Sequence, residues 1–310
     1  MHHTALSGLV LLALASHALA GDTLKVFVLA GQSNMVGAGE VRAREDRNEG
    51  RGSLEHLVRS EETRDRFAHL VAEDGSWIER DDVWISFTGS REARGRLAPG
   101  YGGREDTIGP ELGFGQVVGD HLDEPVLLVK VAWGGKSLAV DFRPPSAGGE
   151  VGPTYTDLLA AIRREVASIG EHFPDLEHDG VEVVGFGWHQ GWNDRINQQF
   201  NDAYEGNLAC FIRDVRRELG VPDLPFVIAE TGMSGREEKH PRALSLMEAQ
   251  AAVARREEFR GTVAFVGTRD FYRPREQSPT GQGYHWNNNA ETYYLIGDGM
   301  GKAMVELLER

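Results

Sequence analysis

The stretch Lys25-Val26-Phe27-Val28-Leu29-Ala30-Gly31-Gln32-Ser33-Asn34-Met35 decides the fold of this 310-residue chain. Its first six residues form a short and nearly continuous apolar run, which is typical of a strand buried on both faces of a parallel sheet. Gly31 permits a tight turn after that strand. Ser33 would then lie at the carboxyl edge of the sheet, where α/β proteins place their sites. A helix N-cap serine is an equally common reading of the same residues.

Similar runs recur along the chain and alternate with helical patterns. Four more strands are expected at residues 125–132, 181–188, 225–230 and 262–268. Apolar residues repeat with a period near 3.6 in helices expected at 158–169 and 204–219, and two further helices are expected at 242–258 and 290–308. This alternation predicts an α/β fold, a three-layer α/β/α sandwich around a parallel sheet.

Residues 41–108 interrupt the alternation. Arg, Glu and Gly dominate there, and one apolar run at 83–87 predicts a strand. The segment has too few apolar residues for a core of its own. We therefore interpret it as an insertion or lid within a single domain of residues 21–310, and its part 91–104 as a mobile, solvated loop.

The first twenty residues predict a secretory signal peptide. An apolar stretch at residues 5–15 precedes the small residues of Ala18-Leu19-Ala20. Cleavage near Ala20 would give a secreted or periplasmic protein. No later run approaches the roughly 20 apolar residues that a membrane-spanning helix needs, so no membrane insertion is expected. The net charge of −15 disfavours nucleic acid as a partner.

A second informative stretch, Gly283-Tyr284-His285-Trp286-Asn287-Asn288, lies between the last expected strand and the final helix. Such a connection returns the chain to the carboxyl edge of the sheet, where Ser33 is expected. A serine and a histidine at one edge are the nucleophile and base of serine-dependent ester hydrolysis. Two further loops follow strands and offer hydrogen-bond donors for an oxyanion. They are Trp133-Gly134-Gly135-Lys136-Ser137 and Trp188-His189-Gln190-Gly191-Trp192-Asn193-Asp194.

Together these blocks, with Gly109-Pro110-Glu111, resemble the SGNH hydrolases and, within them, the sialate O-acetylesterase-like branch, also called carbohydrate esterase family 6. The resemblance implies a flavodoxin-like sandwich. It also implies deacetylation of an acetylated carbohydrate, sialate or xylan, without a metal or cofactor. Ser33 would be the nucleophile that forms an acyl-enzyme, and His285 the base. The oxyanion hole would comprise the N–H groups of Ser33 and Gly135 and the side-chain amide of Gln190 or Asn193.

The chain departs from this family at the acid of the triad. The family has an acid three residues before the histidine, or a glutamate after the His-Gln-Gly block, and these positions are Gln282 and Trp192 here. Asp270, just after the last strand, is one candidate acid, and Asp194 is the other. Asp270 is equally typical of a turn-capping aspartate, and Asp194 of an acid at a helix N-terminus. A Ser–His dyad with a backbone carbonyl as orienter needs neither.

Several side chains are expected to contact the sugar. Tryptophans near the site loops would either pack in the core or form an aromatic wall for a sugar ring. The expected substrate contacts are Gln32, Trp133, Trp192 and Trp286. Because the acid is missing from its usual positions, a non-catalytic carbohydrate-binding protein on the same fold is the alternative function.

Overall fold

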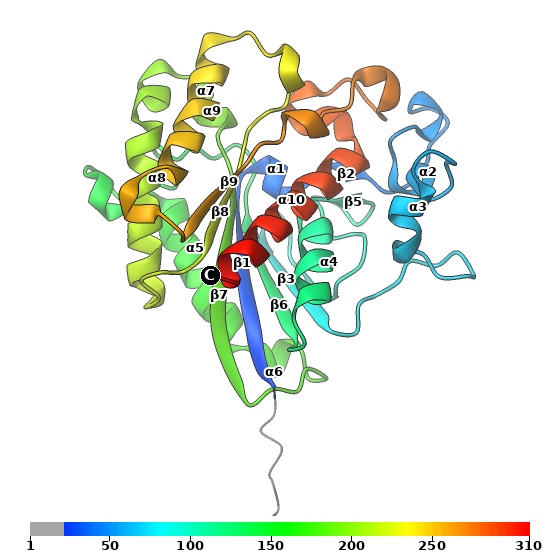
Figure 1. Ribbon diagram of the computed structural model, residues 1–310, viewed down its shortest axis with the longest axis horizontal. Helices are drawn as coiled ribbons and strands as arrows, with labels where there is room; N and C mark the ends of the chain where they lie inside the picture. Colours follow the sequence, from blue (N-terminus) through cyan, green and yellow to red (C-terminus); the bar gives the residue numbers. More distant parts are fainter. Residues whose placement is uncertain (1–21) are drawn as a thin grey trace, which may run out of the picture.

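The computed structural model describes residues 22–310, so the expected signal peptide lies outside the described residues. A seven-stranded sheet forms the centre of the fold, in the order β4-β3-β6-β1-β7-β8-β9 (Figure 1). Every neighbouring pair is parallel except β3 with β4. The strands are β1 (Thr23–Gly31), β3 (Val83–Gly89), β4 (Ala93–Arg96), β6 (Val126–Ala132), β7 (Gly180–His189), β8 (Phe226–Ala229) and β9 (Val263–Val266). The predicted parallel α/β architecture is confirmed.

The strand order contains a topological switch point at β1. Without β3 and β4, the remaining strands lie in the chain order 2-1-3-4-5, which is the flavodoxin-like arrangement. The chain passes from β1 to β6 on one side and then crosses to β7 on the other. Such a reversal opens a crevice at the carboxyl ends of the two central strands, and Ser33 follows β1 directly.

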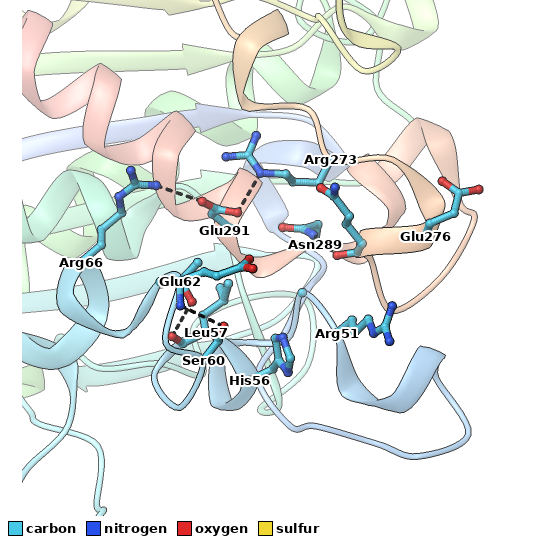
Figure 2. A pocket seen from close by; sticks show the side chains of 13 residues that line it. Arg51, His56, Leu57, Ser60, Glu62, Arg66, Arg273, Glu276, Asn289 and Glu291 are labelled. Carbon is cyan, nitrogen blue, oxygen red and sulfur yellow. Dashed lines mark hydrogen bonds and ion pairs between the residues drawn. The ribbon is translucent and has the colours of Figure 1, made fainter.

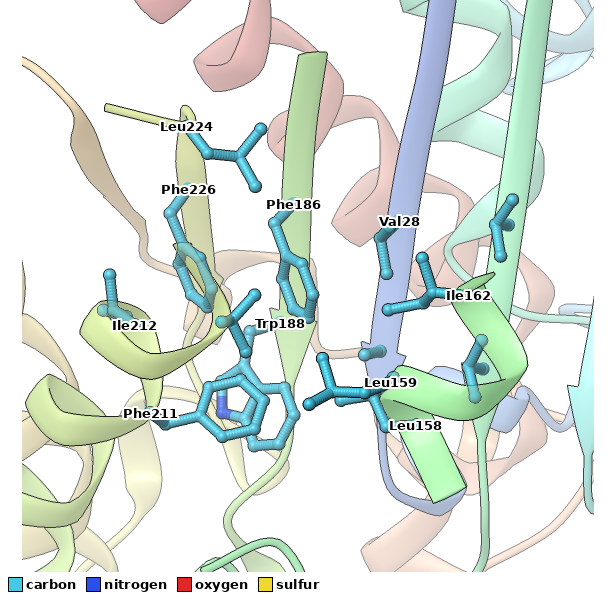
Figure 3. Packing of buried hydrophobic residues seen from close by; sticks show 14 of the residues in the cluster. Val28, Leu158, Leu159, Ile162, Phe186, Trp188, Phe211, Ile212, Leu224 and Phe226 are labelled. Atoms are coloured by element: carbon cyan, nitrogen blue, oxygen red, sulfur yellow. The ribbon is translucent and has the colours of Figure 1, made fainter. Parts of the chain in front are cut away.

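Helices cover both faces of this sheet. On one face lie α5 (Pro153–Ala167), α8 (Gln198–Leu219) and α9 (Pro241–Ala254), and on the other lie α4 (Glu111–His121) and α10 (Ala290–Leu308). Figure 3 shows the first of these cores, where Phe211 of α8 packs against the strand residues Trp188 and Phe226. The rings of Phe211 and Trp188 lie 4.5 Å apart between centroids. The amphipathic patterns in the sequence thus correspond to helices with one buried face.

The helix ends have local causes. The Asn197 side chain accepts hydrogen bonds from two N–H groups of the first turn of α8, and Gly220 ends that helix in a left-handed conformation. The Asn289 side chain accepts the N–H of Thr292 and so caps the start of α10. Gly297 lets α10 lie close against α4, since a Cβ atom at this position would collide with the carbonyl of Pro110. This contact joins the middle of α10 to the start of α4.

The segment 41–108 is partly built into the main sheet. It contributes β3 and β4, and the prediction of a mobile loop at 91–104 is wrong, because β4 pairs antiparallel with β3. Arg94 of β4 forms an ion pair with the buried carboxylate of Glu165, 2.9 Å away, which secures this charged strand. The remaining α-helices and strands are short: α1 (Ser33–Val36), α2 (Leu54–Leu57), α3 (Arg64–Phe67), α6 (Ile169–His172), α7 (Trp192–Arg195), β2 (Gly39–Glu40) and β5 (Thr107–Ile108). Within residues 22–310, no helix combines the length and apolarity needed to cross a membrane.

Candidate active site

Ser33 occupies the first position of α1, immediately after the turn that ends β1. The backbone at Gly31 lies so close to β7 that a Cβ atom there would collide with the carbonyl of His189. The N–H of Gln32 donates to that carbonyl, at 3.2 Å. Gln32 and Asn34 are buried, whereas Ser33 between them is partly exposed. The turn therefore presents the serine to solvent at the switch point of the sheet.

The His285 turn lies against this serine turn, although the two are about 250 positions apart in the sequence. The amide of Asn34 donates to the carbonyl of Tyr284, at 3.1 Å. The hydroxyl of Tyr293 donates to the Asn34 side-chain oxygen at 2.8 Å, and its oxygen lies 3.4 Å from the carbonyl oxygen of His285. The structure thus brings the two segments that carry Ser33 and His285 to one edge.

Backbone strain follows directly after His285. Trp286, Asn287 and Asn288 have φ values of 51°, 56° and 59°. A left-handed conformation costs residues other than glycine about 1–2 kcal/mol each. The Asn287 amide donates to the carbonyl of Arg273 at 3.0 Å, and the Asn288 amide to that of Ala38 at 2.9 Å. These bonds hold the turn in its strained form.

The turn also decides which aromatic side chain faces solvent. Trp286 is 0% exposed, so the expectation that it contacts substrate is wrong. Its indole packs in the core between the sheet and α10. Tyr284, two residues earlier, is 44% exposed. Its ring centroid lies 4.6 Å from that of His285 and 5.7 Å from that of the half-buried Trp192. Sequence reasoning overlooked Tyr284.

The His285 ring is bonded to an amide rather than to a carboxylate. Its Nδ1 lies 3.1 Å from Oε1 of Gln282. Because a carbonyl oxygen only accepts, Nδ1 carries the hydrogen and Nε2 is left to accept a proton. Burial lowers the pKa of His285, which favours the neutral imidazole. Gln282 occupies the position that an acid has in the family. This difference from the family is the feature of the sequence that identifies Gln282 as the residue that orients His285.

Neither candidate acid meets His285 in the part of the chain that the structure describes. The Asp270 side chain is 63% exposed, and its two oxygens bond to Arg236. Asp194 is buried and accepts the N–H groups of Leu138 at 2.8 Å and Ala139 at 2.9 Å. Burial raises its pKa to about 6. Asp194 therefore fixes the 133–139 loop, and the geometry supports neither aspartate as the orienting acid.

Of the two amides expected at the oxyanion hole, Gln190 is already engaged. Its Nε2 contacts Asp194 at 2.6 Å, the carbonyl of Lys136 at 3.0 Å and the side-chain oxygen of Gln32 at 3.3 Å. The two N–H bonds of this amide are already used by these acceptors, so Gln190 is not an oxyanion donor in this arrangement. Gln32 is 2% exposed and accepts the N–H of Gly191 at 3.0 Å. Gln32 therefore joins the loops that follow β1 and β7, and the prediction that Gln32 contacts substrate is wrong.

Three donors remain at the edge. Among the described residues, the N–H groups of Ser33 and Gly135 have no acceptor. Gly135 is exposed and adopts a positive φ of 69°, which suits glycine. Asn193 donates one N–H to the carbonyl of Gly135 at 2.8 Å and retains the other.

Trp133, which was expected to contact substrate, is half-buried and packs against Phe142, with 6.3 Å between ring centroids.

A buried ion pair holds the far end of α1. The Lys130 ammonium donates to the carbonyl of Val36 at 2.8 Å and to the carboxylate of Glu111 at 2.6 Å. Glu111 also accepts the N–H of Gly109, at 2.7 Å. Both charged side chains are almost fully buried. Through Lys130, the Gly109-Pro110-Glu111 block thus holds the last residue of α1, the short helix that begins with Ser33.

Comparison with known proteins is consistent with this geometry. The family described as carbohydrate esterase, sialic acid-specific acetylesterase, matches residues 23–304. The sequence gives no significant match among curated proteins. A protein from Arabidopsis thaliana has a similar structure, at 17% identity and a TM-score of 0.55, over 91% of this chain and 97% of that one.

Two further solved structures are similar. A carbohydrate acetylesterase from Xanthomonas citri gives 13% identity and a TM-score of 0.52, over 90% of this chain and 55% of that one. NanS gives 14% identity and a TM-score of 0.58, over 94% of this chain and 100% of that one. At these identities the likeness shows the fold.

Proposed function

The chain belongs to the sialic acid-specific acetylesterase family of carbohydrate esterases, and from this premise we propose that it removes O-acetyl groups from sugars through an acyl-enzyme on Ser33. Membership makes the chain a carboxylic ester hydrolase, as the resemblance implied. One observation carries the proposed mechanism: Asn34 and Tyr293 tie the Ser33 turn to the His285 turn.

In the first half of the reaction, Ser33 Oγ attacks the acetyl carbonyl while His285 Nε2 accepts the hydroxyl proton. Negative charge develops on the carbonyl oxygen. The N–H groups of Ser33 and Gly135 and the second amide hydrogen of Asn193 stabilise it. The C–O bond to the sugar then breaks, and the sugar oxygen leaves with the proton from His285. The acetyl group stays on Ser33.

In the second half, water replaces the sugar. His285 Nε2 accepts a proton from the water, whose oxygen attacks the acetyl carbon at the same donors. Collapse of this intermediate returns the proton to Ser33 Oγ and releases acetate. The low pKa of His285 keeps the imidazole neutral and basic at neutral pH.

Gln282 orients the base in this mechanism. Its carbonyl oxygen fixes the Nδ1–H tautomer, which is one of the two tasks of a triad acid. The second task is to stabilise the imidazolium by charge, and a neutral amide performs it less well. We therefore propose a Ser–His pair with an amide orienter, which is slower than a full triad.

A sugar substrate is supported by the aromatic side chains beside the base. The ring of Tyr284 lies next to His285, and the ring of Trp192 lies next to Tyr284; aromatic rings of this kind pack against the apolar face of a pyranose. The family description adds sialic acid as the sugar. We also propose that the protein is exported, because the stretch at residues 5–15 has the length and composition of a signal peptide.

Acetate release tests the proposal against the alternative of a non-catalytic carbohydrate-binding protein, which the amide at Gln282 motivates. The substrates are O-acetylated sialic acid and acetylated xylan. The wild type should release acetate from at least one of them, and Ser33→Ala and His285→Ala should release almost none. If the wild type is as inert as both variants but binds the sugars, the alternative is correct.

A further inference from the structure

A cavity of about 650 Å³ lies away from the Ser33 edge, between the segment 41–108 and the start of α10 (Figure 2). Residues 51–66 form one wall, and residues 273–291 form the other. We propose that this cavity is a second saccharide-binding site, which takes another sugar unit of the glycan that carries the acetyl group. The inference rests on the proposed function and adds a binding site to it.

Three charged groups of the cavity hold one another in place. Glu291 is nearly buried, and its two oxygens bond to Arg66 at 2.9 Å and to Arg273 at 2.7 Å. Figure 2 shows the two guanidinium groups on either side of this carboxylate. One nitrogen of Arg66 makes this bond, so its other N–H groups can donate to a ligand. Preorganised donors of this kind lose little entropy on binding.

The lining favours a hydroxyl-rich ligand over other classes. Among the described side chains that line the cavity, Leu57 alone is aliphatic, which excludes a mainly apolar ligand. Three arginines face three glutamates, so the charges balance and no strong anion trap results. Sugar hydroxyls both donate and accept, and they match a wall that offers guanidinium donors beside acceptors such as Glu62. The volume falls in the range of about 300–1,000 Å³ that small ligands occupy.

The cavity lies within reach of the reaction centre. Asn289 lines it and is four residues beyond His285. Four residues span at most about 14 Å between Cα atoms. The His285 turn and the cavity therefore lie within the length of a short oligosaccharide, as the inference requires.

Isothermal titration tests binding independently of ester hydrolysis, because both probes lack acetyl groups. The probes are xylotetraose, which is neutral, and 3′-sialyllactose, which carries a carboxylate. The wild type should bind at least one, and Arg66→Ala should bind it about tenfold more weakly, the loss expected for one hydrogen bond to a charged group. Arg59→Ala is the matched control, since Arg59 is exposed on the same segment and outside the lining. No binding, or equal affinity in the wild type and Arg66→Ala, overturns the inference.

Kinetics separate this inference from the proposed function. p-Nitrophenyl acetate has no sugar, so its kcat/KM should be the same in the wild type and Arg66→Ala. For an acetylated xylo-oligosaccharide or sialoside, KM should rise about tenfold in Arg66→Ala with kcat unchanged. Glu62→Gln, which changes an exposed side chain, should act in the same direction if Arg66→Ala is unstable. An unchanged KM in both variants overturns the second site and leaves the esterase intact. A wild type without esterase activity refutes the proposed function, and the titration then decides by itself whether the cavity binds a saccharide.

Discussion

Replacing Gln282 by glutamate places a negative charge beside the catalytic imidazole without changing the size of the side chain. Oε1 of Gln282 and Nδ1 of His285 are 3.1 Å apart. Opposite charges about 4 Å apart interact by about 4 kcal/mol at an effective dielectric constant of 20, equivalent to about 3 pKa units. Both side chains are half-buried, and solvent screening reduces the effect. We expect Gln282→Glu to raise the pKa of His285 by about 1–2 units.

The assay is the pH dependence of kcat/KM for p-nitrophenyl acetate, whose acid limb reports the pKa of the base in the free enzyme. Burial lowers the pKa of His285, so the wild-type limb should lie below the usual histidine value of about 6.5. A higher pKa keeps the base protonated to higher pH, and the limb of Gln282→Glu should therefore move upward. Its plateau kcat should increase, because the carboxylate stabilises the imidazolium.

Gln282→Met is the matched control for this measurement. It preserves length without an oxygen acceptor, so kcat should fall while the acid limb remains below about 6.5, since no charge is added. An acid limb in Gln282→Glu that coincides with that of the wild type would refute the reasoning, because the new carboxylate would then not face His285 in solution.

Four further outcomes follow from the contacts. Asp270→Asn should leave kcat/KM within about twofold of the wild type, because an exposed ion pair contributes little. Asp194→Asn should lose about 2–3 kcal/mol of stability in denaturant unfolding, because an amide N–H₂ would face the N–H donors of the 133–139 loop. Lys130→Met should cost about 3–5 kcal/mol by calorimetry, since it leaves Glu111 charged and buried; adding Glu111→Gln should recover part of the loss. Asn193→Ala should lower kcat for ester hydrolysis by about 10²–10³ with little change in KM, and an unchanged kcat would remove its amide from the oxyanion hole.

The fold was predictable where the sequence carries a periodic apolar signal. The β1 run and the helix at residues 290–308 are such cases, and the helix has these same bounds in the structure. The edge strand β4 was not predictable, because Ala93–Arg96 contains two arginines and no alternating apolar pattern. It is stabilised by the distant, buried carboxylate of Glu165, and such a long-range ion pair leaves no trace in local sequence.

The site was predictable only at the level of loops. Strand ends identified the turns of Ser33 and His285, but the direction of each side chain depends on backbone torsions. Positive φ values after His285 bury Trp286, while Tyr284 remains exposed. Contacts with other residues occupy the N–H groups of Gln190, whereas Asn193 keeps one N–H free. The spacing of these residues in the sequence does not predict this difference.

Covalent labelling of the nucleophile tests the central claim most directly. A fluorophosphonate reacts with an activated serine, and mass spectrometry of the digested protein locates the adduct. The account predicts one adduct on Ser33, much slower labelling in His285→Ala, and none in Ser33→Ala. Labelling at another serine, or acetate release that persists in Ser33→Ala, would contradict it.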